Sequence, residues 1–198
     1  MNNSKKTIIP EINEVKLIDE LETFIIDCVQ DIRFTIEKET DQNLTEQDKS
    51  ATPTVYKYYL PKREEKNMEE EPITRRNVDF PVPDVTPIYP AIVVRPAEGT
   101  TGIETNSTEY EDINIDICIF VKEYELMNRY NFLLLAKKII INRLRAIPLG
   151  VLANYRLQNN LSWKLLDDSQ EPHACIVISG SWRCNLTSFG AIDVNLLD

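Results

Sequence analysis

A β-branched apolar side chain occupies every second position between residues 112 and 122, and this is the most regular pattern in the chain. Ile113, Ile115, Ile117, Ile119 and Val121 share this spacing, which places them on one face of a β-strand. Shorter alternating runs cover residues 161–165 and 174–186. Because only residues 167–173 separate these two runs, we expect them to form a hairpin.

Two segments show helical spacing instead. The first covers residues 15–36 and can be capped by Asn13 or Glu14. The second covers residues 126–147 and stops at Pro148. The apolar faces that we expect to pack on the sheet are Val15, Ile18, Leu21, Ile25, Cys28, Val29, Ile32 and Ile36 in the first helix, and Leu126, Tyr130, Leu133, Leu134, Ile140, Ile141 and Leu144 in the second.

A further strand is predicted ahead of the isoleucine run. Residues 88–95 are mostly apolar, and Pro96 is expected to end this strand because proline donates no backbone hydrogen bond. Residues 97–110 contain Gly99, Gly102 and several threonines. We interpret them as a long flexible loop that joins the two strands as a hairpin.

These elements predict one α+β domain, a mostly antiparallel sheet of four or more strands with both helices on one face. Its core would come from residues 14–36 and 88–187. Residues 37–78 are rich in charge and are predicted to be a polar insertion or projecting arm, in which residues 55–60 could form a strand of their own. Three prolines favour an extended connector over residues 79–87, and residues 188–198 are expected to be a C-terminal extension.

The net charge and the spacing of the cysteines disfavour several classes of function. With 32 acidic and 22 basic residues the formal net charge is −10, which disfavours binding to nucleic acid through its phosphates. The four cysteines are widely spaced within apolar segments and form no CxxC pair, so we expect reduced, structural thiols. No segment reaches the length of a membrane span or of a signal peptide's apolar run, and a cytoplasmic product is expected.

Candidate catalytic residues are sparse. His173 is the one histidine, and it follows Pro172 at the start of a predicted strand, where a turn residue is the simpler interpretation than a catalytic base. One histidine and scattered thiols give no zinc-ligand spacing. We therefore expect no catalytic residues, no metal and no cofactor.

A metal-dependent nuclease is the alternative from a different functional class. Asp112, Asp116, Glu123 and Glu125 flank the isoleucine strand near Lys122, and two carboxylates with a lysine on strand ends can hold a divalent ion. A solvated sheet face explains the same residues more simply. Trp163 and Trp182 fall on the apolar sides of their strands; core packing is the default expectation for both, and a subunit contact is the alternative for one of them.

Several segments together resemble a known family. They are residues 89–96, the strand 113–121 followed by Lys122-Glu123-Tyr124, the helix through residues 137–144, residues 163–168, and residues 170–173 leading into 176–182. In this order they resemble the tail terminator proteins of long-tailed bacteriophages. The resemblance covers residues 88–187, and the long insertion at residues 37–78 departs from the short form of the family.

The resemblance implies a structural virion protein, not an enzyme. Such a subunit would form a homohexameric ring on the last ring of the tail tube protein, stop tube polymerisation, and present a surface to the head–tail connector or neck protein. The sheath protein is a further candidate partner, served by the insertion, and no membrane is involved. The protein would be assembled in the host cytoplasm and would reside in the virion tail. Six copies would carry roughly −60, so DNA could pass the lumen without specific binding.

The resemblance also suggests where the tube is contacted. The polar residues of the predicted loop, Gly99, Thr100, Thr101, Gly102, Glu104 and Asn106, are the candidate contact to the tube or another partner. Within the same class, the alternative is another neck or tail-completion protein.

Overall fold

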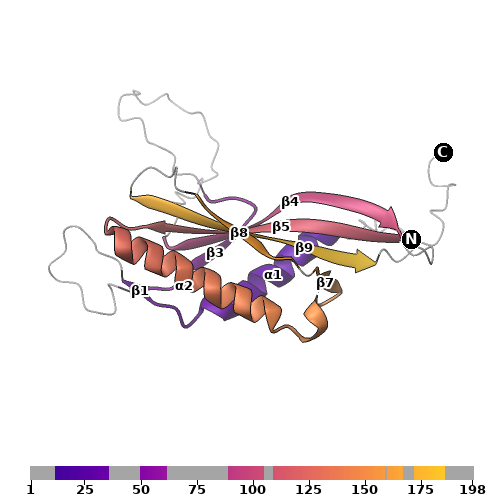
Figure 1. The fold of residues 1–198 in the computed structure, drawn as a ribbon, viewed down its shortest axis with the longest axis horizontal. Helices are drawn as coiled ribbons and strands as arrows, with labels where there is room; N and C mark the ends of the chain where they lie inside the picture. The colour runs from indigo at the N-terminus through magenta and orange to yellow at the C-terminus, as the bar shows by residue number, and fades with distance from the viewer. Residues whose placement is uncertain are drawn as a thin grey trace, which may run out of the picture.

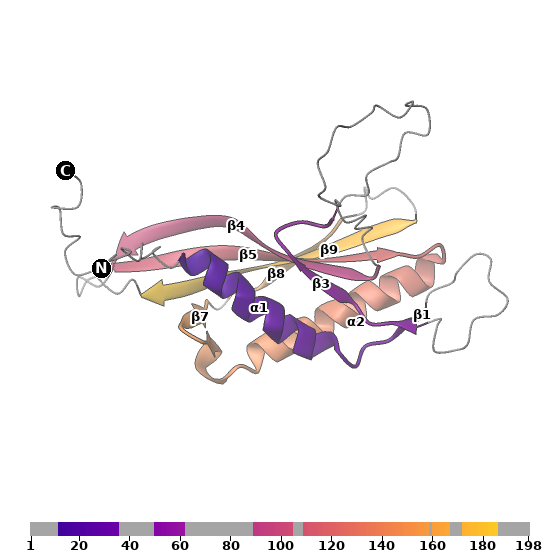
Figure 2. The same cartoon turned by 180° about the vertical axis from the view of Figure 1, so that it is seen from behind.

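The computed structural model of the protein describes residues 12–35, 50–61, 89–104, 109–158, 160–166 and 172–185. Two helices, α1 (Asn13–Val29) and α2 (Leu126–Arg145), lie on one face of a mixed, curled sheet (Figures 1 and 2). The α+β class and the two-helix layer predicted from the sequence are therefore confirmed. A short 3-10 helix, η1 (Pro148–Gly150), follows α2, so the predicted stop at Pro148 falls three residues beyond the last α-helical residue.

The sheet has the strand order β3-β4-β5-β9-β7-β6, and β8 also pairs with β9. Its strands are β3 (Thr54–Lys57), β4 (Ala91–Ile103), β5 (Glu109–Lys122), β6 (Val151–Leu152), β7 (Tyr155–Leu157), β8 (Ser162–Leu166) and β9 (His173–Asn185). A separate two-stranded pair joins β1 (Phe34–Thr35) to β2 (Ser50–Ala51). The sheet is mostly antiparallel as expected, but β3 pairs with β4 in parallel.

The core lies between the sheet and the helices. All five alternating residues of β5 are buried there, together with Trp182 of β9, which has no exposed surface. The helices contribute the facing side chains Leu17, Ile18, Leu21, Ile25, Leu133, Ile140 and Leu144, all without exposed surface. Each fully buried aliphatic side chain of this size stabilises the fold by roughly 1.5–3 kcal/mol, so the periodicity of β5 and of α1 accounts for much of the core.

The start of α1 differs from the prediction. Ile12 is the N-cap and makes no side-chain cap bond, whereas Asn13 or Glu14 was expected to cap. The side-chain amide of Asn13 instead donates a hydrogen bond of 3.0 Å to the Glu111 carboxylate of β5. The backbone carbonyl of Asn13 accepts a hydrogen bond from the Tyr155 hydroxyl of β7. Hydrogen bonds to two strands therefore take the place of a local cap. Val15, the first residue expected on the apolar face of the helix, is exposed.

The buried face of α2 also differs from the prediction, at two positions. Leu133, Leu134 and Leu135 are consecutive, and a helix turns about 100° per residue, so one of them can point into the core. Leu133 is fully buried, while Leu134 is 42% and Leu135 is 50% exposed. The placement of Leu134 in the core was therefore wrong, and so was that of Leu126, which is 51% exposed.

Part of the predicted polar insertion belongs to the sheet. Thr54–Lys57 forms β3 alongside Ala91–Val94 of β4, and Val55 packs against the core. Lys57 ties the strand to α1 through Asp19 at 2.9 Å and Glu22 at 3.3 Å. The strand that the sequence allowed at residues 55–60 is therefore present over residues 54–57, and it belongs to the main sheet instead of to a projecting arm. Residues 36–49, 62–88 and 186–198 lie outside the described residues. These ranges include the predicted connector 79–87 and the predicted C-terminal extension 188–198.

Strand β4 is longer than the sequence suggested. It continues through Pro96 to Ile103, so residues 97–103 are strand and the predicted flexible loop there is wrong. Pro96 is tolerated because the register shifts between Pro96 and Glu98, and because β3 pairs with β4 only as far as Val94. Beyond Val94 the outer edge of β4 has no strand partner within the part of the chain that the structure describes.

We expect substitutions at the two adjacent leucines of α2 to behave in opposite ways. Leu133→Asp places an unpaired charge in the core and should cost about 4 kcal/mol or more of unfolding free energy. Leu134→Asp, on the exposed side, should change it by less than about 1 kcal/mol. Urea unfolding followed by circular dichroism measures both. Equal destabilisation by the two variants would contradict the orientation of α2.

Candidate functional site

The strongest candidate site is the end of the sheet beside the start of α1, where the tips of β4, β5 and β9 extend past the helix layer (Figure 1). We call this the sheet end and define it as residues 95–104, 109–116 and 179–185. Four of the predicted contact residues, Gly99, Thr100, Thr101 and Gly102, lie here in β4, and Glu104 follows directly. The sixth, Asn106, lies outside the described residues. The candidate residues are thus held together, but by a paired strand instead of a loop.

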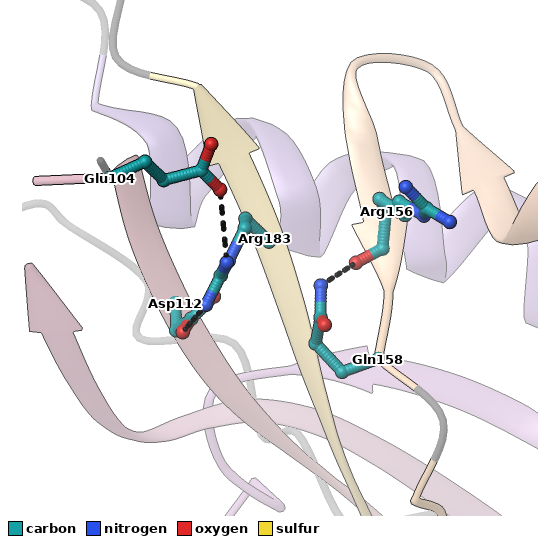
Figure 3. Close-up of polar contacts among 5 residues, drawn as sticks. All are labelled: Glu104, Asp112, Arg156, Gln158 and Arg183. Atoms are coloured by element: carbon teal, nitrogen blue, oxygen red, sulfur yellow. Dashed lines mark hydrogen bonds and ion pairs between the residues drawn. The ribbon is translucent and has the colours of Figure 1, made fainter. Parts of the chain in front are cut away.

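Arg183 of β9 organises the outer face of the sheet end (Figure 3). Its Nε and Nη2 donate to the two carboxylate oxygens of Asp112 on β5, both at 2.7 Å, and Nη1 lies 3.2 Å from Glu104. Its guanidinium also stacks 3.9 Å from the ring centroid of Tyr110. Hydrogen bonding to Asp112 raises the pKa of Arg183 above its ordinary value. This bidentate, stacked geometry needs arginine and would not be reproduced by lysine.

Gly102 makes room for this stack. It pairs with Tyr110 across β4 and β5, and a Cβ at Gly102 would lie 2.7 Å from the tyrosine ring. Any larger residue would push the ring out of its place under Arg183. The glycine that suggested a loop in the sequence therefore serves close cross-strand packing.

The two aspartates weighed as nuclease ligands are both engaged by arginines. Asp112 binds Arg183, and Asp116 lies 3.4 Å from Arg95 and accepts a 2.6 Å hydrogen bond from Ser179. Glu123 is buried at the end of β5, where its side chain accepts the backbone N–H of Glu125. Among the residues with described positions, no group of three histidine, cysteine or acidic side chains is placed to hold a metal ion.

His173 opens β9 opposite Lys122 of β5, and its ring lies 5.4 Å from that of Tyr89. His173 therefore lies at the start of a strand, as expected from the sequence. It lies at the opposite end of β9 from Arg183, so the structure does not bring the histidine to the sheet end.

The four cysteines are all free and buried. Burial raises the pKa of Cys28, Cys118 and Cys184 to about 11 and that of Cys175 to about 12. Thiols with such pKa values stay protonated at neutral pH and are poor nucleophiles and poor metal ligands. Cys118 and Cys175 lie with Val93 in a small apolar cluster that is separate from the main core.

Trp163 was expected in the core, and that was wrong. It lies on β8 and is 50% exposed, and the Lys137 ammonium of α2 lies 3.8 Å from its ring centroid. Strand β8 is short and, within the described structure, pairs only with β9. The alternation of apolar and polar residues along it therefore does not indicate which side chains are buried. Trp182 is buried as predicted.

A second feature was missed by the sequence analysis. Strands β6 and β7 form a small hairpin after α2, and between them and the helix end lies a cleft of about 210 Å³. Arg145, Arg156 and Gln158 line it together with Leu149, Leu157 and Leu161. Arg156 pairs with Arg183 across β7 and β9, so the cleft adjoins the sheet end. Strands of two and three residues are too short to give a detectable alternation.

The chain matches no protein-family model, and no curated protein matches it either. Within the described segments, neither helix combines the length and apolarity needed to cross a membrane.

We expect Arg183→Ala to loosen the sheet end while leaving the core folded. Losing one partly exposed bidentate ion pair and its ring contact should cost roughly 1 kcal/mol locally, which corresponds to about fivefold faster amide hydrogen exchange. The change should be confined to residues 110–114 and 181–185. Arg183→Lys, which keeps the positive charge but loses the two-pronged guanidinium, should give an intermediate exchange rate. Exchange that is unchanged in both variants would show that Arg183 does not hold this end together.

We also expect the thiols to resist alkylation in the folded protein. Because each folded pKa is raised, the protonated thiols favour the folded state up to the ordinary thiol pKa, and this contribution falls as the pH rises toward 11–12. Iodoacetamide should modify few thiols at pH 8 and all four in urea, as counted by intact mass. Rapid modification of Cys118 or Cys175 in the folded protein would contradict their burial.

Proposed function

We propose that this chain is a structural virion protein that caps the tail tube of a long-tailed bacteriophage. In this proposal it forms a homohexameric ring on the last ring of tail tube protein, stops tube polymerisation and offers the surface to which the head–tail connector or neck protein joins. The sequence resemblance over residues 88–187 suggests the role.

One structural observation carries the proposal furthest: the sheet end extends beyond the helix layer and leaves the outer edge of β4 without a strand partner after Val94, among the residues described. Such an edge offers backbone donors and acceptors to another protein. The Arg183 contacts hold this end in place before binding. A preformed surface loses less conformational entropy on docking than a flexible loop.

The contact to the tube is proposed at Gly99, Thr100, Thr101, Gly102 and Glu104. Thr100 and Thr101 are exposed, and they point to opposite faces of the strand. Substitutions here can therefore block a partner from either face without entering the core.

Tube capping tests the proposal directly. Purified tail tube protein of the same particle should polymerise to a limited length when this chain is added, as measured by electron microscopy. The double variant Thr100→Lys/Thr101→Lys should lose capping by at least about tenfold in effective concentration, since two solvated cations would have to be desolvated at the contact. Unlimited tube growth with the wild-type chain would reject the function.

Two controls make the outcome specific. Lys138→Thr, on the exposed side of α2, should cap normally. A connector-binding assay separates the alternatives, because another neck or tail-completion protein would bind the connector but leave tube length unchanged. Magnesium-dependent cleavage of plasmid DNA would instead favour the nuclease alternative, which the pairing of Asp112 and Asp116 with arginines disfavours.

A further inference from the structure

Charge is strongly segregated between two neighbouring segments of the chain. Residues 97–121 contain six acidic and no basic residues, namely Glu98, Glu104, Glu109, Glu111, Asp112 and Asp116. Residues 126–166 contain seven basic and no acidic residues, namely Arg129, Lys137, Lys138, Arg143, Arg145, Arg156 and Lys164. The first segment covers residues 97–103 of β4 and 109–121 of β5, which form the end of the β4–β5 hairpin, and the second includes α2, β6, β7 and β8.

The fold places the acidic segment and two residues of the basic segment, Arg145 and Arg156, on opposite sides of the sheet end. The strands run across it in the order β4, β5, β9, β7. The β4–β5 hairpin therefore lies toward one edge and β7 toward the other (Figures 1 and 2). The cleft lies beside β7, where Arg156 and Leu157 line it. A molecule with complementary surfaces on opposite edges can associate head to tail with copies of itself.

The basic edge has two cations that form no ion pair with any carboxylate that the structure describes. The ion pairs formed among the described residues use Lys57, Arg95 and Arg183, and none of them uses Arg145 or Arg156 of the cleft. Beside these two guanidinium groups the cleft offers apolar surface, including Leu149, which is 88% exposed. Two cations around an apolar patch suit a ligand that is both acidic and apolar.

The acidic edge has the matching chemistry. Asp112 and Asp116 are already paired with arginines, but Glu98 and Glu109 are exposed. Neither forms an ion pair with any residue that the structure describes; Glu98 only accepts a hydrogen bond from Asn114. Ile103, which pairs with Glu109 across the hairpin, is 70% exposed. Ile103 and Glu109 thus lie side by side at the end of the hairpin, and Glu98 lies five residues back along β4, opposite Asn114.

We propose that the acidic hairpin of one copy, through Glu98, Ile103 and Glu109, docks against the cationic cleft formed by Arg145, Arg156 and Leu149 of the next copy. The proposal rests on the ring of the proposed function and names the interface that would build it. A second copy is the occupant because the chain carries both halves of the contact. Because the net charge is −10, electrostatic attraction between copies requires that surfaces of opposite local charge be brought together.

Charge reversal tests the interface. The hairpin variant Glu98→Lys/Glu109→Lys and the cleft variant Arg145→Glu/Arg156→Glu should each weaken self-association by at least about tenfold relative to wild type. A mixture of the two should associate again, because each hairpin then meets a cleft of opposite charge and the copies alternate. Sedimentation velocity at low salt measures all three samples, and association should weaken as salt is added.

Matched controls exclude trivial causes. Lys138→Glu/Lys164→Glu makes the same charge change on the basic segment away from the cleft and should associate nearly as the wild type does. Circular dichroism and the unfolding midpoint of each variant confirm that it is folded. A variant that fails to fold is replaced by its milder form, Glu98→Gln/Glu109→Gln or Arg145→Gln/Arg156→Gln, which should weaken association in the same direction.

Three outcomes would overturn the interface: a wild-type chain that stays monomeric at low salt up to its highest soluble concentration, single-surface variants that associate as the wild type does, or a mixture that stays as weak as its components. Tube capping is read separately. Self-association with charge rescue but without capping would reject the tail function and leave the interface standing. Capping by both charge-reversed variants would reject the interface and leave the function standing.

Discussion

Every layer of this protein depends on the pairing and packing of β5. Its backbone bonds to β4 on one side and to β9 on the other over almost its whole length, while Ile113, Ile115, Ile117, Ile119 and Val121 face the helices. A strand that is both central and apolar on one face allows few registers, because a shift by one residue would turn all five side chains to the opposite face. The length of β5 also sets how far its neighbours can extend, and thereby creates the sheet end.

The two faces of β5 have different tasks. Toward the helices it supplies the core, and toward the outer face it carries Cys118 and Phe120 near one end and Asp112 and Asp116 near the other. The apolar outer residues pack with Cys175 and Val177 of β9. The aspartates bind Arg183 and Arg95 from the flanking strands. One strand thus joins an apolar half and an ionic half of the same outer face, and the ionic half belongs to the sheet end.

Features that follow from a regular spacing of apolar residues could be predicted from the sequence. Features that depend on contacts with another helix or strand could not. The alternation of β5 and β9, and most of the buried face of α1, were visible because one face is buried along the whole element. Three consecutive leucines in α2 could not be told apart without the sheet, and Leu134 was misplaced. Residues 97–103 suggested a loop because glycines weaken strand propensity, yet the paired β5 and the space that Tyr110 needs explain Gly102 in a strand. The cleft could not be predicted, because its residues come together only after α2, β7 and the segment near Leu161 have packed.

The outward side of α2 has a consequence for the behaviour of the protein in solution. Leu126, Met127, Leu134 and Leu135 are each at least 42% exposed, and Trp163 lies exposed beside the same helix. Apolar surface of this kind favours association of any copies that approach closely. Long-range repulsion between acidic molecules opposes that approach at neutral pH. It fades toward the isoelectric point near pH 4.7, so colloidal stability rests on ionised carboxylates more than on a polar surface, and mild acid would bring the protein out of solution before it unfolds.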